Sequence, residues 1–391
     1  MDVDNFHCLG ETSVEEFLAK YWQQKPLVIR NAFPNFQSPI TAEELAGLAC
    51  EEHINARLVL EKDGEKPWQL EFGPFEEERF SELPESDWTL LVSDVEKHLP
   101  DTKFLIRPFQ FIPDWRIDDL MVSYAPPGGS VGAHTDAYDV FLLQLNGQRL
   151  WKISENYDEE TLSDTDLCIL KNFTAEQEFL LNPGDMLYLP PNVAHHGIAQ
   201  SNYDADGNEA HCLTASIGFR APSIKSMTSD FVHYLNDNVH STTRYRDHNP
   251  ALPKHHAEIS EETVSDFMEY LKQGLTLEPD QVKRWLGQYC SDNKAFEELA
   301  FEHTDCDYEE LCNIAAQETL IQSPYSHFLF SHGENTCILF VDGCSYDVSE
   351  GFALSICTDA NIDFHQLANS MTETDKTVML TLFNNGSIIS S

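Results

Sequence analysis

The sequence predicts an α+β protein built around a closed antiparallel barrel or jelly roll. Three observations support this fold class. Between Leu105 and Pro222, short apolar runs are separated by Gly, Pro and Asn, which is typical of antiparallel strands joined by tight turns. Residues 223–294 instead carry apolar side chains at helical spacing, and residues 295–391 alternate helices with short strands. The 391 residues are therefore expected to form three regions, 1–222, 223–294 and 295–391.

The first region is expected to begin with helices that flank the barrel. Residues 14–23 form an amphipathic helical pattern, and a strand is predicted at 26–30. Two further helices are predicted at 42–50 and 88–98. From Leu105 onward the pattern changes to strands.

A hairpin is predicted where two apolar runs flank Asn146-Gly147, because Asn-Gly is the strongest short hairpin signal. On the returning strand, positions 149, 151 and 153 share one face, since strand side chains alternate. That face carries Trp151, Ile153 and one cation, Arg149. An arginine among apolar inward residues usually binds an anion, and its planar fork suits a carboxylate. The alternative is an arginine at the strand end that reaches solvent.

The glycine-rich stretch 128–132 leads into His134-Thr135-Asp136. In a strand, residues two apart point to the same side, so His134 and Asp136 can both reach one ion. Two histidines and one carboxylate form the facial triad of non-haem Fe(II) oxygenases, which leaves coordination positions open.

The third ligand is expected from a later block. Pro183-Gly184-Asp185 predicts a tight turn, residues 186–189 a short buried strand, and Pro190-Pro191 its end before His195. His-x-Asp alone is a weak signal in a chain with 16 histidines, but this order of turn, strand and late histidine favours a metal site. The spacing favours His195 over the adjacent His196, which is expected to face solvent or support the ligands.

These stretches, with 113–121, 134–141 and 216–222, resemble the JmjC-type cupin oxygenases and, within them, the bacterial ribosomal oxygenases. The resemblance covers nearly the whole chain and is most specific between Trp115 and Pro222. It implies an enzyme dependent on Fe(II), 2-oxoglutarate and O2 that hydroxylates an arginine of the sixteenth large-subunit ribosomal protein. It further implies a double-stranded β-helix fold and a homodimer formed through residues 223–294. The alternative is that these residues cap the barrel of a monomer.

The resemblance also implies roles for individual residues. His134, Asp136 and His195 would hold the iron, and Arg149 would pair with the distal carboxylate of 2-oxoglutarate, although the basic position near Trp151 varies among relatives. Polar cosubstrate contacts would come from a strand that contains Thr214 and Ser216. On the substrate side, Tyr138 and Asp139 flank the triad, and an acid there would suit a guanidinium. These four could equally be ordinary strand residues.

Composition agrees with a protein substrate. Lys and Arg number 24 against 66 Asp and Glu, which gives a net charge of −42. Such a chain lacks the basic footprint of direct nucleic-acid binding and could attract a basic protein. Generic surface acidity for solubility or salt tolerance would give the same net charge. The ten cysteines contain no Cys-x-x-Cys pair, which fits the reducing cytosol and predicts a cytoplasmic protein. No signal peptide or membrane-spanning run is visible, so we expect a soluble intracellular protein.

In the third region, helices are predicted at 308–320 and 364–371, and a small hairpin at Asp342-Gly343. This region resembles a winged-helix arrangement, but its acidity predicts a structural or protein-contacting role. Two rival functions remain open. A JmjC-type protein demethylase would use the same iron chemistry on an N-methyl group, and a non-enzymatic cupin would bind metal or a small anion as a sensor.

Overall fold

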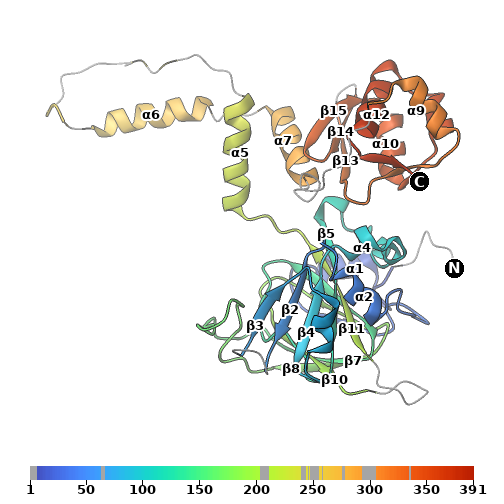
Figure 1. Cartoon of the computed structure of the whole chain (residues 1–391). Coiled ribbons are helices and arrows are strands. Elements are labelled where there is room, and N and C mark those ends of the chain that lie inside the picture. Colours follow the sequence, from blue (N-terminus) through green and yellow to red (C-terminus); the bar gives the residue numbers. More distant parts are fainter. Residues whose placement is uncertain are drawn as a thin grey trace. The chain divides into compact units, whose positions relative to one another are not determined.

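The computed structural model describes residues 7–62, 67–202, 211–238, 244, 246, 255–257, 259–274, 278–292, 305–333 and 336–391. The chain divides into two compact units, Met1–Ala221 and Pro222–Ser391. Figure 1 shows the elements of both. The predicted boundary between residues 294 and 295 lies outside the described residues.

The first unit contains two antiparallel sheets. The larger has the strand order β1-β9-β6-β11-β5-β4-β2-β3 and the smaller the order β10-β7-β8. The strands of the large sheet are β1 (Leu27–Ile29), β2 (Ala56–Leu60), β3 (Gln69–Phe72), β4 (Trp88–Val92), β5 (Ile117–Ala125), β6 (Asp139–Asn146), β9 (Met186–Leu189) and β11 (Cys212–Phe219). Those of the small sheet are β7 (Gln148–Ser154), β8 (Gln177–Leu181) and β10 (Ala194–Gln200).

The two faces of the large sheet have different partners. One face packs on the helices α1 (Val14–Lys20) and α2 (Ala42–Leu48), through a buried cluster that includes Phe17, Leu58 and Tyr188. The opposite face meets the small sheet, because Val140 and Leu142 of β6 share a buried cluster with Trp151 of β7. Two sheets packed with a common interior confirm the predicted jelly roll.

Capping residues explain where the first helices begin. The Ser13 side chain accepts a hydrogen bond from the Glu16 amide at the start of α1, and Thr41 with Glu44 forms a reciprocal capping box on α2. Both helices end earlier than predicted, at Lys20 and Leu48. The remaining helices of this unit are short: α3 (Glu77–Ser81), α4 (Val95–His98) and three 3-10 turns, Pro100–Leu105, Arg107–Phe109 and Asp114–Arg116.

The helix predicted at 88–98 is wrong. Trp88–Val92 forms strand β4, all five residues of which are buried, and only Val95–His98 is helical. The strand pairs with β2 on one side and β5 on the other. A short apolar run buried on both faces lacks the alternation that distinguishes a strand from a helix, so tertiary pairing decides.

The hairpin predicted at Asn146-Gly147 is also wrong. Strand β6 pairs with β11 and β9, whereas β7 pairs with β10 and β8, so the two apolar runs lie in different sheets. Both edges of β6 are already occupied. Gly147 has φ +63°, and a Cβ there would lie 2.7 Å from the His211 carbonyl oxygen. The dipeptide is therefore the corner at which the chain crosses between sheets.

The second unit begins with three helices, α5 (Ile224–Asn238), α6 (Glu261–Gly274) and α7 (Pro279–Ser291). Its later part has two three-stranded sheets, β16-β12-β17 and β13-β14-β15. The hairpin predicted at Asp342-Gly343 is confirmed, since Val341 pairs with Cys344 and both turn residues have positive φ. The elements are α9 (Tyr308–Ala315), β12 (Leu320–Gln322), β13 (Phe328–His332), β14 (Cys337–Val341), β15 (Cys344–Val348), α10 (Glu350–Thr358), β16 (Asn361–Ile362), α11 (Phe364–Ala368), α12 (Glu373–Asn384) and β17 (Ile388–Ser390).

Two predicted helices of this unit are shorter than expected. The helix expected at 308–320 ends at Ala315, and Leu320 opens strand β12 instead. The helix expected at 364–371 ends at Ala368. Within the described part of the chain, no helix is both long enough and apolar enough to span a membrane.

Candidate metal centre

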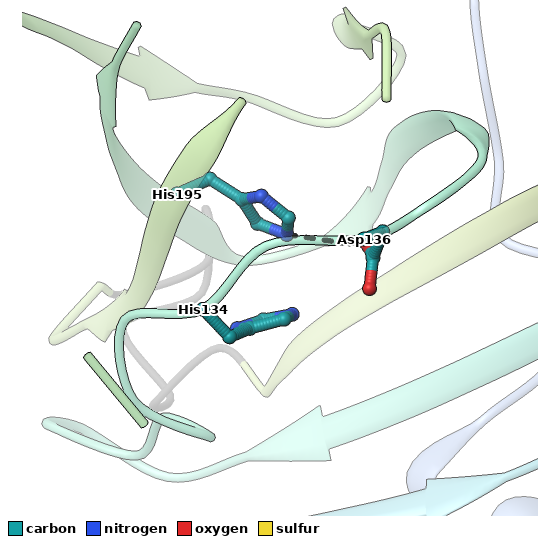
Figure 2. Close-up of side chains that lie close together, drawn as sticks. All are labelled: His134, Asp136 and His195. Atoms are coloured by element: carbon teal, nitrogen blue, oxygen red, sulfur yellow. Dashed lines mark ion pairs between the residues drawn. The ribbon is translucent and has the colours of Figure 1, made fainter. Parts of the chain in front are cut away.

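His134, Asp136 and His195 converge in the interior of the first unit (Figure 2). Each offers one ligand atom, and these three atoms lie within 4.8 Å of one another. The Nε2 atom of His195 is 3.6 Å from a carboxylate oxygen of Asp136. The two imidazole centroids are 4.2 Å apart. This donor set, with two nitrogens and one oxygen around a common point, suits a divalent transition metal with open positions.

The backbone around the site brings the three residues together. His134 and His195 form an isolated β-bridge, in which each amide donates to the other residue's carbonyl, at 3.0 and 2.9 Å. The segment His134-Thr135-Asp136 is therefore bridged at a single residue and is not part of a continuous strand. The Asp136 carbonyl accepts from the Asn192 amide at 2.8 Å, in the turn that precedes β10. The two ligand-bearing segments thus hold each other in place.

The turn before β9 is held by a carboxylate. Asp185 accepts hydrogen bonds from the amides of Asn31 and Asn182 and from the Arg30 guanidinium. These hydrogen bonds connect the end of strand β1 with the turn before β9. They thereby hold the start of the segment that leads through β9 to His195.

Hydrogen bonds at the far side of each ring orient the histidines. Nδ1 of His134 lies 3.0 Å from the Gly132 carbonyl oxygen, and Nδ1 of His195 lies 2.9 Å from that of Val193. A carbonyl oxygen only accepts, so each Nδ1 carries the proton and donates it. Each Nε2 then keeps a free lone pair, which is the arrangement that histidine ligands of metals need.

Burial sets the charge of the site. His195 is 3% exposed, and this burial, reinforced by His134, lowers its pKa to about 3, so its ring is neutral at ordinary pH. Burial raises the pKa of the Asp136 carboxyl, which opposes its ionisation. A bound cation would favour the carboxylate, so the residues fit a metal ion in both geometry and charge.

The triad opens into a cavity of about 570 Å³ between the two sheets. The inward faces of β2, β4, β5, β6 and β11 line it on one side and β7 on the other. Residues 167–169 contribute a third wall. The cavity is large enough for a small acid and a substrate side chain together.

Arg149 lies in this cavity on β7 and is 3% exposed. Its Nε and Nη2 atoms have no hydrogen-bond partner among the described residues, and the guanidinium lies 5.8 Å from the Trp151 ring centroid. The alternative in which Arg149 reaches solvent is therefore wrong. A buried cation with unused donors is unfavourable unless an anion pairs with it and accepts those hydrogen bonds.

Thr214 and Ser216 both point from β11 into the cavity. Thr214 is fully buried and donates to Gln144 at 3.1 Å. The two positions lie on the face that also carries Gly218, since they alternate along the strand.

The side chains of Tyr138 and Asp139 lie on opposite faces of the large sheet. Tyr138 lines the cavity and is 40% exposed. Asp139 does not line it: its buried carboxylate accepts from the Tyr188 hydroxyl at 2.6 Å, the Gln23 side-chain amide at 3.0 Å and Arg116 at 3.3 Å. With these three partners, Asp139 joins the segment after α1 to the sheet rather than facing a substrate.

Sequence reasoning missed the acids Asp118 and Asp119, which line the cavity at the start of β5. Burial, reinforced by Asp94 and Asp118, raises the pKa of Asp119 to about 6. Asp119 Oδ1 would lie 3.3 Å, and the Tyr138 ring 3.9 Å, from a Cβ added to Gly218. The sequence signal was the alternation Asp119, Met121, Ser123, which puts three cavity-lining residues on one strand face.

The sequence is similar to a known domain family and to two proteins that are named as ribosomal oxygenases or hydroxylases. Residues 104–227 match the JmjC domain family. The chain is 37% identical over 280 residues to the ribosomal protein uL16 3-hydroxylase of Escherichia coli K12, covering 71% of each protein. It is 40% identical over 225 residues to a probable ribosomal oxygenase of Haemophilus influenzae, covering 56% of this chain and 53% of that protein.

Solved structures agree over almost the full length. The X-ray structure of E. coli YcfD superposes with a TM-score of 0.84 at 29% identity, covering 97% of this chain and 99% of that one. A second YcfD structure, in complex with cobalt and 2-oxoglutarate, has a TM-score of 0.82 at 30% identity, with coverage of 97% and 99%.

Proposed function

The chain belongs to the ribosomal oxygenases with a JmjC domain, and we propose that it hydroxylates an arginine of the large-subunit ribosomal protein uL16. It is an Fe(II)- and 2-oxoglutarate-dependent oxygenase, in keeping with the cobalt and 2-oxoglutarate bound by its structural relative. The observation that carries the proposal is the convergence of His134, Asp136 and His195 in a cavity that also contains the uncompensated cation Arg149.

We assign the iron to the Nε2 atoms of His134 and His195 and to the Asp136 carboxylate. When bound, Fe(II) with 2-oxoglutarate and O2 supplies the oxidant that inserts one oxygen atom into a C–H bond and releases succinate and CO2. The protein's part is to hold the histidines neutral and aimed, through the carbonyls of Gly132 and Val193.

We place the distal carboxylate of 2-oxoglutarate on Arg149, whose unused Nε and Nη2 donors match a carboxylate's two oxygens. Thr214 and Ser216 are the polar groups on the facing strand. Trp151 is 6% exposed beside Arg149 and excludes water from this end of the cavity, which strengthens the ion pair.

We place the target guanidinium beside Asp119 and Tyr138. Both side chains lie beside Gly218, where a side chain would approach the Asp119 carboxylate oxygen and the Tyr138 ring and reduce the space around them. A carboxylate whose burial opposes its ionisation gains most from a cationic partner. Tyr138 would pack against the guanidinium plane. Asp139, predicted as a second contact, has its carboxylate engaged by other side chains and is not part of this assignment.

The test combines the chain with Fe(II), 2-oxoglutarate and a uL16 fragment. A mass gain of one oxygen atom on a single arginine, with succinate formed in equal amount, supports the proposal. Formaldehyde release instead would identify a demethylase. Bound metal without succinate would favour a non-enzymatic sensor. The matched control is Asp136→Ala, which removes one ligand and should abolish the mass gain.

We also propose that the chain forms a homodimer and works in the cytoplasm, where ribosomal proteins are made. Helix α6 supports the dimer, since Val264, Phe267, Met268 and Leu271 repeat at helical spacing and are 43–60% exposed. An exposed apolar row of this kind suits a second copy. Light scattering tests both points. A wild-type mass equal to one chain would contradict the homodimer, and a dimeric mass for Phe267→Glu would contradict the role of α6.

The division into 1–222, 223–294 and 295–391, with a winged-helix-like third region, remains our proposal for the domain organisation. The acidic composition supports a protein-contacting role for that region over nucleic-acid binding.

A further inference from the structure

Two polar residues on the adjacent strands β4 and β2 of the large sheet face the cavity and have no assigned role. Arg57 lies on β2 and Thr89 on β4, and both line the cavity. In the strand register Arg57 is opposite Leu91, and Val59 is opposite Thr89. Arg57 and Thr89 are therefore diagonal neighbours on the same inward face.

Both residues have unused hydrogen-bonding capacity. Thr89 is fully buried, and its hydroxyl has no partner among the residues that the structure describes. The Nε atom of Arg57 is also buried and has no partner among the described residues, and its Nη2 contacts the Met121 sulfur at 3.7 Å. A thioether is a weak acceptor. Buried donors without partners are unfavourable and call for an acceptor that occupies the cavity.

The charges around the cavity decide which acceptor fits. Asp94, Asp118 and Asp119 line the same space. A carboxylate brought in beside these acids would meet like charge, which disfavours it. A neutral carbonyl oxygen meets no such penalty and can accept from the guanidinium and from the hydroxyl. Met121 links the two places, because it contacts Arg57 and lies on the strand face that Asp119 also occupies.

We propose that Arg57 and Thr89 hydrogen-bond a neutral carbonyl of the substrate, namely the main-chain carbonyl of the segment that carries the target residue. This inference rests on the proposed function and adds a recognition point on β2 and β4 to the guanidinium site on β5. It makes the enzyme selective for an arginine within a peptide over a free arginine.

The test measures peptide hydroxylation by the full chain at varied concentrations of a uL16 peptide. Loss of a charged hydrogen bond predicts that Arg57→Met raises the KM for the peptide by about tenfold. Thr89→Val, which keeps shape and loses only the hydroxyl, is expected to raise it by about threefold. The KM for 2-oxoglutarate should stay at the wild-type value in both variants, and Arg57→Lys should recover part of the affinity.

Lys62→Met is the matched control. Lys62 is also a cation of the large-sheet region but pairs with Asp87 and does not line the cavity, so its loss should leave the peptide KM unchanged. A peptide KM unchanged in both Arg57→Met and Thr89→Val, with wild-type enzyme active, overturns the inference alone. An inactive wild type overturns the proposed function instead.

Alanine substitutions in the peptide separate the sources of the carbonyl. If the acceptor is the main chain, no single alanine in the flanking residues reproduces the loss seen with Arg57→Met. If one alanine at Asn or Gln reproduces it, the acceptor is a side-chain amide and the main-chain assignment is wrong. If an acidic flanking residue is required, the cavity accepts a carboxylate despite its own acids, and the neutral carbonyl is likewise wrong.

Discussion

At the scale of single residues, burial determines what each side chain of the site can do. His195 and Arg149 are both 3% exposed, but one is neutral and the other charged. The neutral imidazole has its Nδ1 proton engaged by a carbonyl and presents a lone pair. The guanidinium keeps two donors unused. One residue is thus ready for a cation and the other for an anion, within one cavity.

Replacing Arg149 separates binding from stability. Arg149→Met removes the partner proposed for the distal carboxylate, so the KM for 2-oxoglutarate should rise by about 10- to 100-fold. The same change removes an uncompensated buried charge, so the ligand-free protein should melt at a higher temperature. Succinate release and thermal unfolding measure the two effects. An unaltered KM would show that the anion site lies elsewhere.

The neutral state of His195 makes the metal-free protein sensitive to acid. Its pKa is lowered from 6.5 to about 3 on folding. Between these values the unfolded chain binds a proton that the folded chain does not, so stability falls as pH drops through this window. The group contributes up to about 1.4 kcal/mol per pH unit. Urea unfolding in the presence of a chelator should show a shallower decline for His195→Asn, and equal slopes would refute the assignment.

At the scale of elements, the site depends on a change of sheet. Strand β6 belongs to the large sheet and β7 to the small one, so the chain must turn a corner at Gly147. This corner puts Arg149 on the wall opposite Thr214 and Ser216. A simple hairpin would have placed all three in one layer, with no space between them for a cosubstrate.

Gly147→Ala tests that corner. A side chain there would adopt φ +63° and press on the His211 carbonyl, so we expect a loss of about 2–4 kcal/mol of unfolding free energy. Gly47→Ala is the control. Gly47 lies in α2 with open space around it, and alanine should stabilise the helix by up to about 1 kcal/mol. Chemical denaturation measures both, and a neutral Gly147→Ala would contradict the strain expected at this corner.

The same elements explain what the sequence could reveal. The His-x-Asp spacing and the turn-strand-His block are local patterns, so the three residues could be identified from the order of amino acids alone. The hairpin prediction failed because Asn-Gly indicates a tight turn but does not determine which strands pair. Both edges of β6 pair with other strands, so β7 cannot pair with it. Arg57 and Thr89 left no local signal, since their shared face arises only when β2 and β4 pair.

At the scale of the whole molecule, we expect net charge to influence the encounter with the proposed substrate. The chain carries a net charge of −42, and the proposed substrate is a basic ribosomal protein. Opposite charges raise the association rate at low salt, whereas the buried contacts of the cavity are screened much less. Affinity for the small cosubstrate and capture of the large substrate should therefore respond differently to ions.

Salt titration checks this difference. The kcat/KM for uL16 should fall by about tenfold between roughly 20 and 300 mM salt. A short peptide in which the target arginine is flanked by neutral residues is the control and should lose much less. If the two substrates decline in parallel, the acidic surface has no part in substrate capture.

The reciprocal bridge between His134 and His195 has a consequence for metal loading. Each residue's amide donates to the other's carbonyl, so the backbone holds the two histidines next to each other before any ion binds. The ligand residues are already close together in the folded chain. The entropic cost of ordering them when an ion binds should therefore be small. Exchange of one divalent metal for another should accordingly proceed with the barrel intact.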